Sequence, residues 1–378
     1  MKILYIGHYK EFGGWAQAAT DYILALDRAG ADVVCRNVTL TKDKPDVNRR
    51  ILELEKKSAE GCNVCIQHVL PHHVVGTDTF DKNIAFLASE STSIKHLAWL
   101  EHLKQVDEVW VPNKDSQESL RVDGIDSLSV KVIPHTCSTE KYKVRHKQIS
   151  LPEIDNEFKF YYIGDLNDRK NLEATIACYQ SEFSSSDSVT LVLKVKKFGL
   201  NENQTSALVE ETTKKVLDSL RMNVKEPANY LIVANELSEE EICSMHQYCD
   251  CFVCPSHGEA WSIPSFDAMA FGNTPICSDF GGPREFIDKT KWRTGHLIDG
   301  VFSVCRCSDA AFPDLFTGRE YWFQPCEKQI KEAMRKAYNS WSNNKVNYKL
   351  RNIKEGLNQA EKFSYENIGK KMIEVIGE

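Results

Sequence analysis

Residues 255–272 read PSHGEAWSIPSFDAMAFG. The apolar run Cys251–Cys254 just before them predicts a buried strand, and Ser265–Phe271 predicts a helix. Pro264 suits the first turn of that helix, because proline lacks the N–H that a helix start leaves without an intrahelical acceptor. The stretch is therefore a strand–loop–helix unit, the kind from which parallel α/β domains are built.

Similar units fill most of the chain in two successive series. The first contains the helix pattern Ala16–Arg28 between its first two strands. Its candidate strands are Lys2–Ile6, Asp32–Arg36, Asn63–His68, Asn83–Leu87, Glu108–Val111 and Val130–Pro134. The second alternates the candidate strands Phe158–Ile163, Val189–Val195, Tyr230–Val233 and Cys251–Cys254 with the helix patterns Asn171–Phe183, Thr205–Leu220 and Ser238–Tyr248. Two parallel α/β domains are therefore predicted.

The length of 378 residues agrees with two domains. The pattern fails across Glu140–Asn156, a polar stretch that contains Pro152 and suits a linker. The tail carries helix patterns at Lys328–Tyr338 and Asn367–Ile376. We expect four segments: 1–145 as the first domain, 146–156 as the linker, 157–355 as the second domain, and 356–378 as a helix packing back toward the first domain.

Composition excludes several classes of protein. The net charge of −7 offers no general attraction to nucleic acid or anionic lipid. The sequence contains no run of about 18 apolar residues, so it predicts no membrane span. The first residues form a strand pattern rather than a secretory signal. We expect a soluble, cytoplasmic protein.

The 13 cysteines agree with a reducing compartment, since many lie in apolar runs where buried free thiols are common. Cys62 and Cys65 with the histidines His68, His72 and His73 form the one metal-like cluster. Strand alternation sends neighbouring side chains of this run to opposite faces, so we predict no metal there. The pair Cys305 and Cys307 is a weaker candidate still.

The chemistry of the decisive stretch is that of a phosphate site beside two acids. Free N–H groups and the helix dipole at the start of the predicted helix favour a phosphate or diphosphate. Glu259 precedes this helix and Asp267 lies on its first turns. A carboxylate can accept hydrogen bonds from vicinal sugar hydroxyls. Taken singly, Glu259 is better interpreted as a surface loop acid and Asp267 as a solvated helix residue.

The whole run resembles the donor-binding signature of retaining GT-B glycosyltransferases of family 4, the glycosyl transferases group 1. In that family two acids are separated by seven residues, as Glu259 and Asp267 are here. Three further stretches are similar to the family: 107–113 (DEVWVPN), 133–135 (IPH) and 274–286 (TPICSDFGGPREF). The resemblance implies a GT-B fold, with two Rossmann-like domains whose parallel sheets face a central cleft.

The resemblance also implies roles for individual residues. Glu259 would hold the hydroxyls of the transferred sugar and Asp267 the ribose of the nucleotide. Arg169 and Lys170 would neutralise the diphosphate leaving group, although such a pair is otherwise a solvated helix start. The remaining donor-binding candidates are Gly13, Gly14, Ala260, Trp261, Ser262 and Ile263. A tight turn is an equal reading of the two glycines.

Glu90 follows the strand Asn83–Leu87 and is a further catalytic candidate, with a structural hydrogen-bonding role as the alternative. The sequence departs from the family at two positions. Asp267 is one methylene shorter than the usual Glu, and Asp165 stands where many relatives have a basic residue. The long stretch Lys289–Pro325 has no assigned role.

The sequence thus predicts a retaining transferase that moves a hexose-type sugar from a nucleotide-sugar, UDP-sugar rather than GDP-sugar, without a cofactor or metal. The first domain would serve the acceptor and the second the donor. The acceptor is a hydroxyl compound of open class: a glycan, a lipid, a small molecule, a protein or a hydroxymethylated DNA base, the last disfavoured by the acidic charge. Alternatives are a nucleotide-sugar hydrolase or epimerase, a non-catalytic binding protein, and an NAD-dependent enzyme, which the incomplete glycine fingerprint disfavours.

Overall fold

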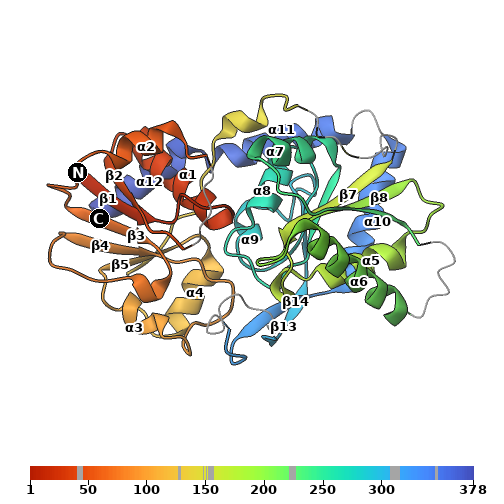
Figure 1. Ribbon diagram of the computed structural model, residues 1–378, viewed down its shortest axis with the longest axis horizontal. Helices are drawn as coiled ribbons and strands as arrows, with labels where there is room; N and C mark the ends of the chain where they lie inside the picture. Colours follow the sequence, from red (N-terminus) through yellow and green to blue (C-terminus); the bar gives the residue numbers. More distant parts are fainter. Residues whose placement is uncertain are drawn as a thin grey trace. The chain divides into compact units, whose positions relative to one another are not determined.

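The computed structural model describes residues 1–40, 46–126, 129–147, 149, 151, 157–220, 227–306, 316–344 and 348–378. The chain forms two compact units (Figure 1). Unit 1 comprises Met1–Thr139 and Ala360–Glu378, and unit 2 comprises Glu140–Gln359. In the described part of the expected linker, the N–H of His146 donates to Gln247 Oε1 at 3.0 Å and that of Ile149 to Ser244 Oγ at 2.8 Å. These residues therefore pack on unit 2.

Unit 1 is built on a six-stranded parallel sheet with the order β2-β1-β3-β4-β5-β6. Its strands are β1 (Lys2–Gly7), β2 (Asp32–Asn37), β3 (Val64–His68), β4 (Lys82–Phe86), β5 (Glu108–Val111) and β6 (Val130–Val132). Its helices are α1 (Gly14–Arg28), α2 (Arg49–Glu55), η1 (Pro71–His73), α3 (Trp99–Leu103), α4 (Lys114–Val122) and α12 (Tyr365–Gly377). The short helix η2 (Thr139–Tyr142) follows β6 and begins at the last residue of the first segment of unit 1.

The C-terminal helix α12 completes unit 1, and both chain ends lie in this unit (Figure 1). The Tyr365 hydroxyl donates to Asp21 of α1, and the Lys82 ammonium of β4 donates to the Ile376 carbonyl at 3.0 Å. Gly369 permits close packing, because a Cβ atom there would lie 2.2 Å from the Ala25 carbonyl oxygen of α1. The last helix is thus held against elements from the start of the chain.

Unit 2 has a second six-stranded parallel sheet, with the order β12-β11-β10-β7-β8-β9. Its strands are β7 (Phe158–Asp165), β8 (Val189–Lys196), β9 (Asn229–Val233), β10 (Cys251–Cys254), β11 (Ile276–Ser278) and β12 (His296–Ile298). Its helices are η3 (Asp168–Lys170), α5 (Leu172–Glu182), α6 (Glu202–Ser219), α7 (Glu239–Tyr248), α8 (Ile263–Ala270), α9 (Pro283–Phe286), α10 (Glu327–Asn343) and α11 (Tyr348–Glu361). An antiparallel hairpin joins β13 (Gly300–Val304) to β14 (Tyr321–Pro325).

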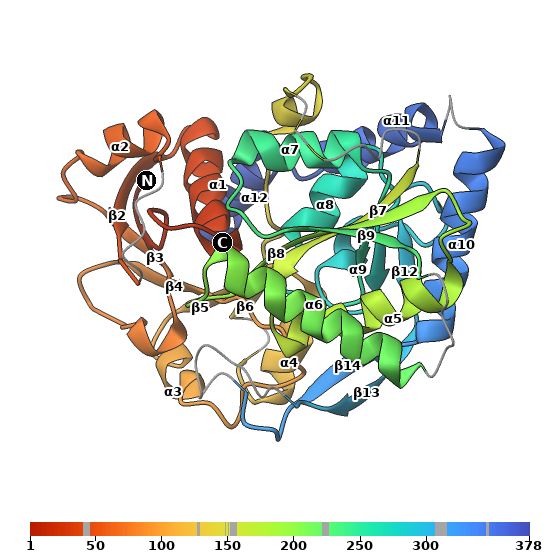
Figure 2. The same ribbon diagram turned by 45° about the vertical axis from the view of Figure 1, so that its right-hand side comes forward.

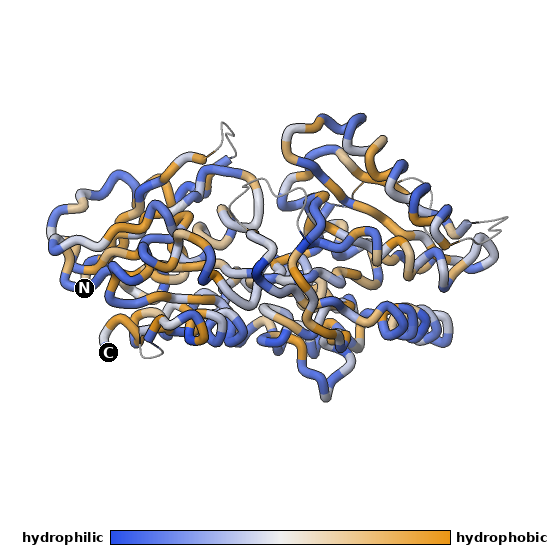
Figure 3. Tube along the Cα trace, turned by 90° about the horizontal axis from the view of Figure 1, so that it is seen from below, coloured by the Kyte–Doolittle hydropathy of each residue, from blue (hydrophilic) through white to orange (hydrophobic). Residues whose placement is uncertain are grey.

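Strand alternation gives this sheet two apolar faces. Phe158, Phe160 and Tyr162 of β7 point into a core that α5, α6 and α10 cover, whereas Tyr161 lies in a second core under α7 and α8. Figure 2 shows α5 and α6 on one side of β7, β8 and β9 and α7 and α8 on the other. Figure 3 shows apolar stretches, in orange, alternating along the chain trace with hydrophilic stretches, in blue. The prediction of two α/β domains with parallel sheets is confirmed.

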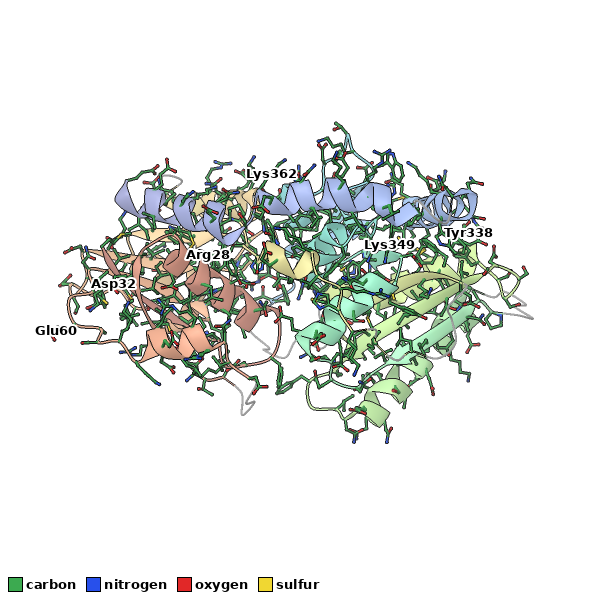
Figure 4. All side chains as sticks on the ribbon, turned by 90° about the horizontal axis from the view of Figure 1, so that it is seen from above. Arg28, Asp32, Glu60, Tyr338, Lys349 and Lys362 are labelled. Atoms are coloured by element: carbon green, nitrogen blue, oxygen red, sulfur yellow. The ribbon has the colours of Figure 1, made fainter. Side chains whose placement is uncertain are left out.

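The helix α11 was not predicted, and a half-buried lysine attaches it to unit 2. Figure 4 labels Lys349 near its start and Tyr338 on α10. The Lys349 ammonium donates to the carbonyl oxygens of Gln247 at 2.6 Å and His246 at 3.2 Å, at the end of α7. Burial lowers the pKa of Lys349, and nearby Asp250 opposes that shift.

The described cysteines are all free thiols, and each is buried except for the partly buried Cys326. Cys307 lies outside the described residues. Cys62 and Cys65 pack with Leu4 and Val34, and His68 Nδ1 lies 2.8 Å from the Tyr5 hydroxyl. Across the ranges described above, no three His, Cys, Asp or Glu side chains gather as a metal site would require. No described helix has both the length and the apolarity that crossing a bilayer demands.

The close contact of α12 with α1 makes Gly369 sensitive to substitution. Gly369→Ala should lower the free energy of unfolding by about 2 kcal/mol, because the added methyl would overlap the Ala25 carbonyl. Urea unfolding measures this change. Gly377→Ala is the matched control in the same helix, since a Cβ atom there meets no atom within 4 Å. Equal stability of the two variants would contradict this packing.

Candidate functional site

The loop between β10 and α8 carries the predicted donor residues on a constrained backbone. Ser262 precedes α8 with a φ of 69°, in the left-handed region that few non-glycine residues adopt. Its hydroxyl lies 2.6 Å from the Ser265 hydroxyl. Ile263 and Ser265 belong to the first turn of α8, whereas Phe266 is the first whose N–H bonds back to Ser262. The helix start therefore directs N–H groups outward, as an anion site requires.

A second loop, η3, lies against the first because β7 and β10 are neighbouring parallel strands whose carboxyl ends meet at one sheet edge. The N–H of His257 donates to the Arg169 carbonyl at 2.8 Å, and Arg169 Nη1 donates to the Gly258 carbonyl at 2.7 Å. Asn171 ends η3 with a φ of 53° and donates through Nδ2 to the Pro255 carbonyl at 2.9 Å. These bonds hold Arg169 and Lys170 beside the loop that carries Glu259.

Glu259, Arg169 and Lys170 form an ion cluster. Glu259 is 7% exposed, and its Oε1 lies 2.7 Å from Lys170 Nζ and 3.3 Å from Arg169 Nη1. Burial acts to raise the pKa of Glu259, but the charges of Lys170 and Arg169 outweigh it and hold the pKa below its ordinary value. Glu259 is therefore ionised at neutral pH, and the side-chain cations of Lys170 and Arg169 both lie next to its Oε1 atom.

Two glycines let a third loop approach Glu259. A Cβ atom on Gly281 would lie 2.2 Å from the Glu259 carbonyl oxygen, and one on Gly282 would lie 2.2 Å from Trp261 Cα. The N–H of Gly282 donates to that same Glu259 carbonyl at 2.9 Å. Gly281 also has a φ of 74°, so both its backbone conformation and its surroundings favour glycine.

Asp267 lies on α8 as predicted, but the chain's own side chains already bind it. Its Oδ1 accepts a hydrogen bond from the Tyr142 hydroxyl at 2.6 Å, and Lys141 Nζ lies 3.1 Å from the carboxylate. Burial acts to raise the pKa of Asp267, and the Lys141 charge, His246 and the Tyr142 bond together lower it below its ordinary value. Asp267 as a whole residue is 5% exposed. Its four lone-pair sites leave room for further donors.

The candidates from the first series of elements belong to unit 1. Gly13 has a φ of 110° directly before α1, and Gly14 begins that helix. Both are exposed, and Glu90 is half-buried in the segment after β4. The structure thus brings together Arg169, Lys170 and Glu259 in unit 2, with Ala260, Trp261, Ser262, Ile263 and Asp267 on the same loop and helix.

Asp165 ends β7 near this cluster. Burial raises its pKa above the ordinary value, and the charges of Lys196, Lys170, Lys197 and Arg169 act in the opposite direction. Sequence reasoning missed Lys141 and Tyr142 as partners of Asp267. Their only sequence signal is a Lys-Tyr pair at the start of a stretch that was interpreted as polar and irregular.

A family model and several solved structures are similar to this chain. Residues 145–304 match the family model described as Glycosyl transferases group 1. HepE from Anabaena, solved in complex with UDP and glucose, superimposes with a TM-score of 0.65 at 13% identity, over 100% of this chain and 99% of that one. The chain has the GT-B fold. No curated protein sequence matches it.

Two further GT-B structures are similar over their whole length. Sucrose-phosphate synthase from Thermosynechococcus elongatus has a TM-score of 0.64 at 14% identity, covering 100% of this chain and 98% of that one. The lipopolysaccharide outer core galactosyltransferase WaaB, in its apo form, has a TM-score of 0.60 at 14% identity, covering 100% and 99%. At such identities the likeness establishes the GT-B fold, and the roles of individual residues stay predictions.

The ion cluster predicts a pH-dependent contribution to stability. Lys170→Met should lower the free energy of unfolding at pH 7 by about 2 kcal/mol, since Glu259 would lose its nearest cation while Arg169 remains. The folded-state pKa of Glu259 is depressed, so its stabilisation exists above the unfolded value of about 4.3 and disappears as the pH falls through the folded value. The difference between variant and wild type should therefore shrink toward pH 4.

Urea unfolding at pH 7 and pH 4 tests this dependence. Lys215→Met is the matched control, because Lys215 pairs with Glu211 on the exposed surface of α6 and should contribute little at either pH. Lys170→Met could instead lower the free energy of unfolding by the same amount at both pH values. That result would show that the variant acts through something other than the charge of Glu259.

Proposed function

We propose that this protein is a retaining glycosyltransferase that moves a hexose-type sugar from a nucleotide-sugar to a hydroxyl group of an acceptor. The observation that carries the proposal is the meeting of Glu259, Arg169 and Lys170 beside the start of α8. The match of residues 145–304 to the glycosyl transferases group 1 model supports it.

The leaving group sets the first chemical requirement. A departing nucleoside diphosphate gains negative charge in the transition state, and fixed donors and cations stabilise it most when they are already in position. In this proposal Arg169 and Lys170 supply the cations, and the first turn of α8 supplies the N–H groups. These groups would stabilise part of that charge, and the proposal routes no step through a metal.

The acids serve the hydroxyls of the donor. Glu259 is anionic and buried, and it would accept hydrogen bonds from the sugar while its two cations turn to the diphosphate. Asp267 would bind the ribose in addition to Tyr142 and Lys141. Gly13, Gly14 and Glu90 of unit 1 are proposed to meet the donor or acceptor. The catalytic set is Glu259, Arg169, Lys170 and Glu90.

Retention of configuration and family 4 membership rest on the resemblance of residues 255–272, and the leaving phosphate would then take the proton of the acceptor hydroxyl. UDP is the proposed nucleotide, because the HepE structures are complexes with UDP or UDP-glucose. The cytoplasm is the proposed compartment, since 13 cysteines suit a reducing environment.

The nucleotide is predicted by a difference in stabilisation. UDP should raise the thermal midpoint more than GDP at the same concentration, because we expect the protein to bind UDP more tightly. A ligand that binds only the folded state stabilises it by roughly 2.7 kcal/mol at 100 times its Kd, and a weaker ligand at the same concentration stabilises it less. Differential scanning fluorimetry with both nucleotides measures this effect. A larger rise with GDP would reverse the assignment of the base, and no rise with either nucleotide would remove the basis of the proposal.

If Glu259 holds the transferred sugar, replacing it should impair turnover of UDP-glucose but leave the binding of UDP intact. Glu259→Gln should lower kcat/KM for UDP release from UDP-glucose about 100-fold, as loss of one positioned transition-state partner does. The affinity for UDP itself should stay within about twofold, because the residue would hold the sugar and not the nucleotide. Glu211→Gln, on the exposed surface of α6, is the control and should behave as wild type.

UDP release is to be measured with and without a panel of hydroxyl acceptors, and the anomeric configuration of the product by NMR. Release only with an acceptor and an α product from the α-linked donor support retaining transfer. Release without any acceptor would identify a hydrolase, and nucleotide binding with no release under any condition would identify a binding protein.

A further inference from the structure

Asp165 is an acidic residue to which the proposed function gives no role. It ends β7 and pairs in register with Lys196 at the end of β8. Further back on these strands, Tyr161, Ile163 and Val192 pack in the core under α7 and α8. Side chains alternate along a strand, so Asp165 and Lys196 project from the same face as these three residues. The two side chains are therefore neighbours on the face of the sheet that α8 covers.

The end of β7 lies at the point where the order of the sheet reverses. The strands β8 and β9 extend the sheet on one side of β7, whereas β10, β11 and β12 extend it on the other. Open α/β sheets bind ligands at such a point, beyond the carboxyl ends of the strands. Asp165 ends the strand on one side of it, and Glu259 follows β10 on the other. Asp165 thus belongs to the same sheet edge as the proposed donor site.

Four cations lie close enough to act on the Asp165 carboxyl: Lys196, Lys170, Lys197 and Arg169. Burial raises the pKa of Asp165, and these charges oppose that rise. The residue is only half-buried, and we expect its carboxyl to be ionised at pH 7. Lys170 and Arg169 also pair with Glu259, at 2.7 and 3.3 Å. Two acids therefore share the cations that are proposed to meet the diphosphate.

A negative charge at this place acts differently on the substrate and on the product of the transfer. In UDP-glucose the terminal phosphate is esterified, whereas in free UDP it ionises a second time with a pKa of about 6. Free UDP therefore carries more negative charge at pH 7 than UDP-glucose does. The repulsion between like charges grows in proportion to each charge. A fixed carboxylate beside the diphosphate thus opposes the binding of UDP more strongly.

We propose that Asp165 sets the balance between substrate and product, because its negative charge weakens the binding of UDP more than the binding of UDP-glucose. The charge would favour release of the product after each transfer. This inference rests on the proposed transferase function, since it places the diphosphate beside Arg169 and Lys170. Asp165 acts through its charge and needs no contact with the ligand, so it is a specificity-determining residue.

The test measures the affinities of the full-length protein for UDP and for UDP-glucose by isothermal titration calorimetry. Asp165→Asn removes the charge and nearly keeps the size of the side chain. This variant should bind UDP about tenfold more tightly than the wild type and UDP-glucose only about threefold more tightly, because the gain grows with the charge of the ligand. Asp218→Asn, on the exposed surface of α6, is the matched control and should leave both affinities unchanged.

Salt supplies a second readout. The gain in UDP affinity of Asp165→Asn over the wild type should shrink when sodium chloride is raised from about 50 mM to about 500 mM, since salt screens charges that solvent reaches. A gain that is the same at both salt concentrations would show that the variant acts through local structure, and it would contradict the inference.

The neighbouring cation provides a test in the opposite direction. Lys196→Met should weaken the binding of UDP more than the binding of UDP-glucose, because it removes a positive charge from the same group. Tighter binding of UDP in this variant would contradict the inference.

The failure of this inference can be told apart from the failure of the proposed function. If the wild type binds neither UDP nor UDP-glucose, the transferase proposal fails and the inference fails with it. If the wild type binds both ligands but Asp165→Asn weakens both equally or changes neither, the inference alone is overturned. Weaker binding of UDP-glucose with unchanged binding of UDP would show that Asp165 holds the sugar, and this result also overturns the inference.

Discussion

The buried carboxylate of Glu259 is the constraint on which the rest of unit 2 depends. A buried carboxylate without partners is too costly to remain ionised, and here Lys170 and Arg169 compensate it from one side. The compensation works only if the loops after β7 and β10 lie together. They do so because β10 and β7 are adjacent strands in the sheet.

Backbone conformations then adapt to this arrangement. Ser262 and Asn171 take positive φ angles on either side of the cluster, and Gly281 and Gly282 allow a third loop to reach the backbone of Glu259 and Trp261. Strain of this kind collects where the surrounding structure holds it in place, and such places are commonly functional. The hairpin β13–β14 is attached to the same region through its bonds to His257.

Local patterns in the sequence predicted many of the regular elements closely. The strands Glu108–Val111 and Cys251–Cys254 have the predicted bounds, and the helix predicted at Ser238–Tyr248 is α7, with Ser238 and Glu241 forming a capping box at its start. Apolar runs of branched and aromatic residues make such strands recognisable. The hairpin was not predicted, because Val301 and Phe302 are exposed and belong to no periodic buried face. The amphipathic pattern of the helix α11 was missed, although Asn347, a residue type favoured before a helix, directly precedes it.

For the candidate site, the sequence by itself determined which residues follow each strand: Arg169 and Lys170 after β7, and Glu259 after β10. These are local properties, set by apolar runs and the turns that end them. Only the tertiary structure decided the partners. Lys170 meets Glu259 across 89 positions and Tyr142 meets Asp267 across 125. The physical reason is that the order of strands in a sheet depends on the packing of the whole unit, which no short segment encodes.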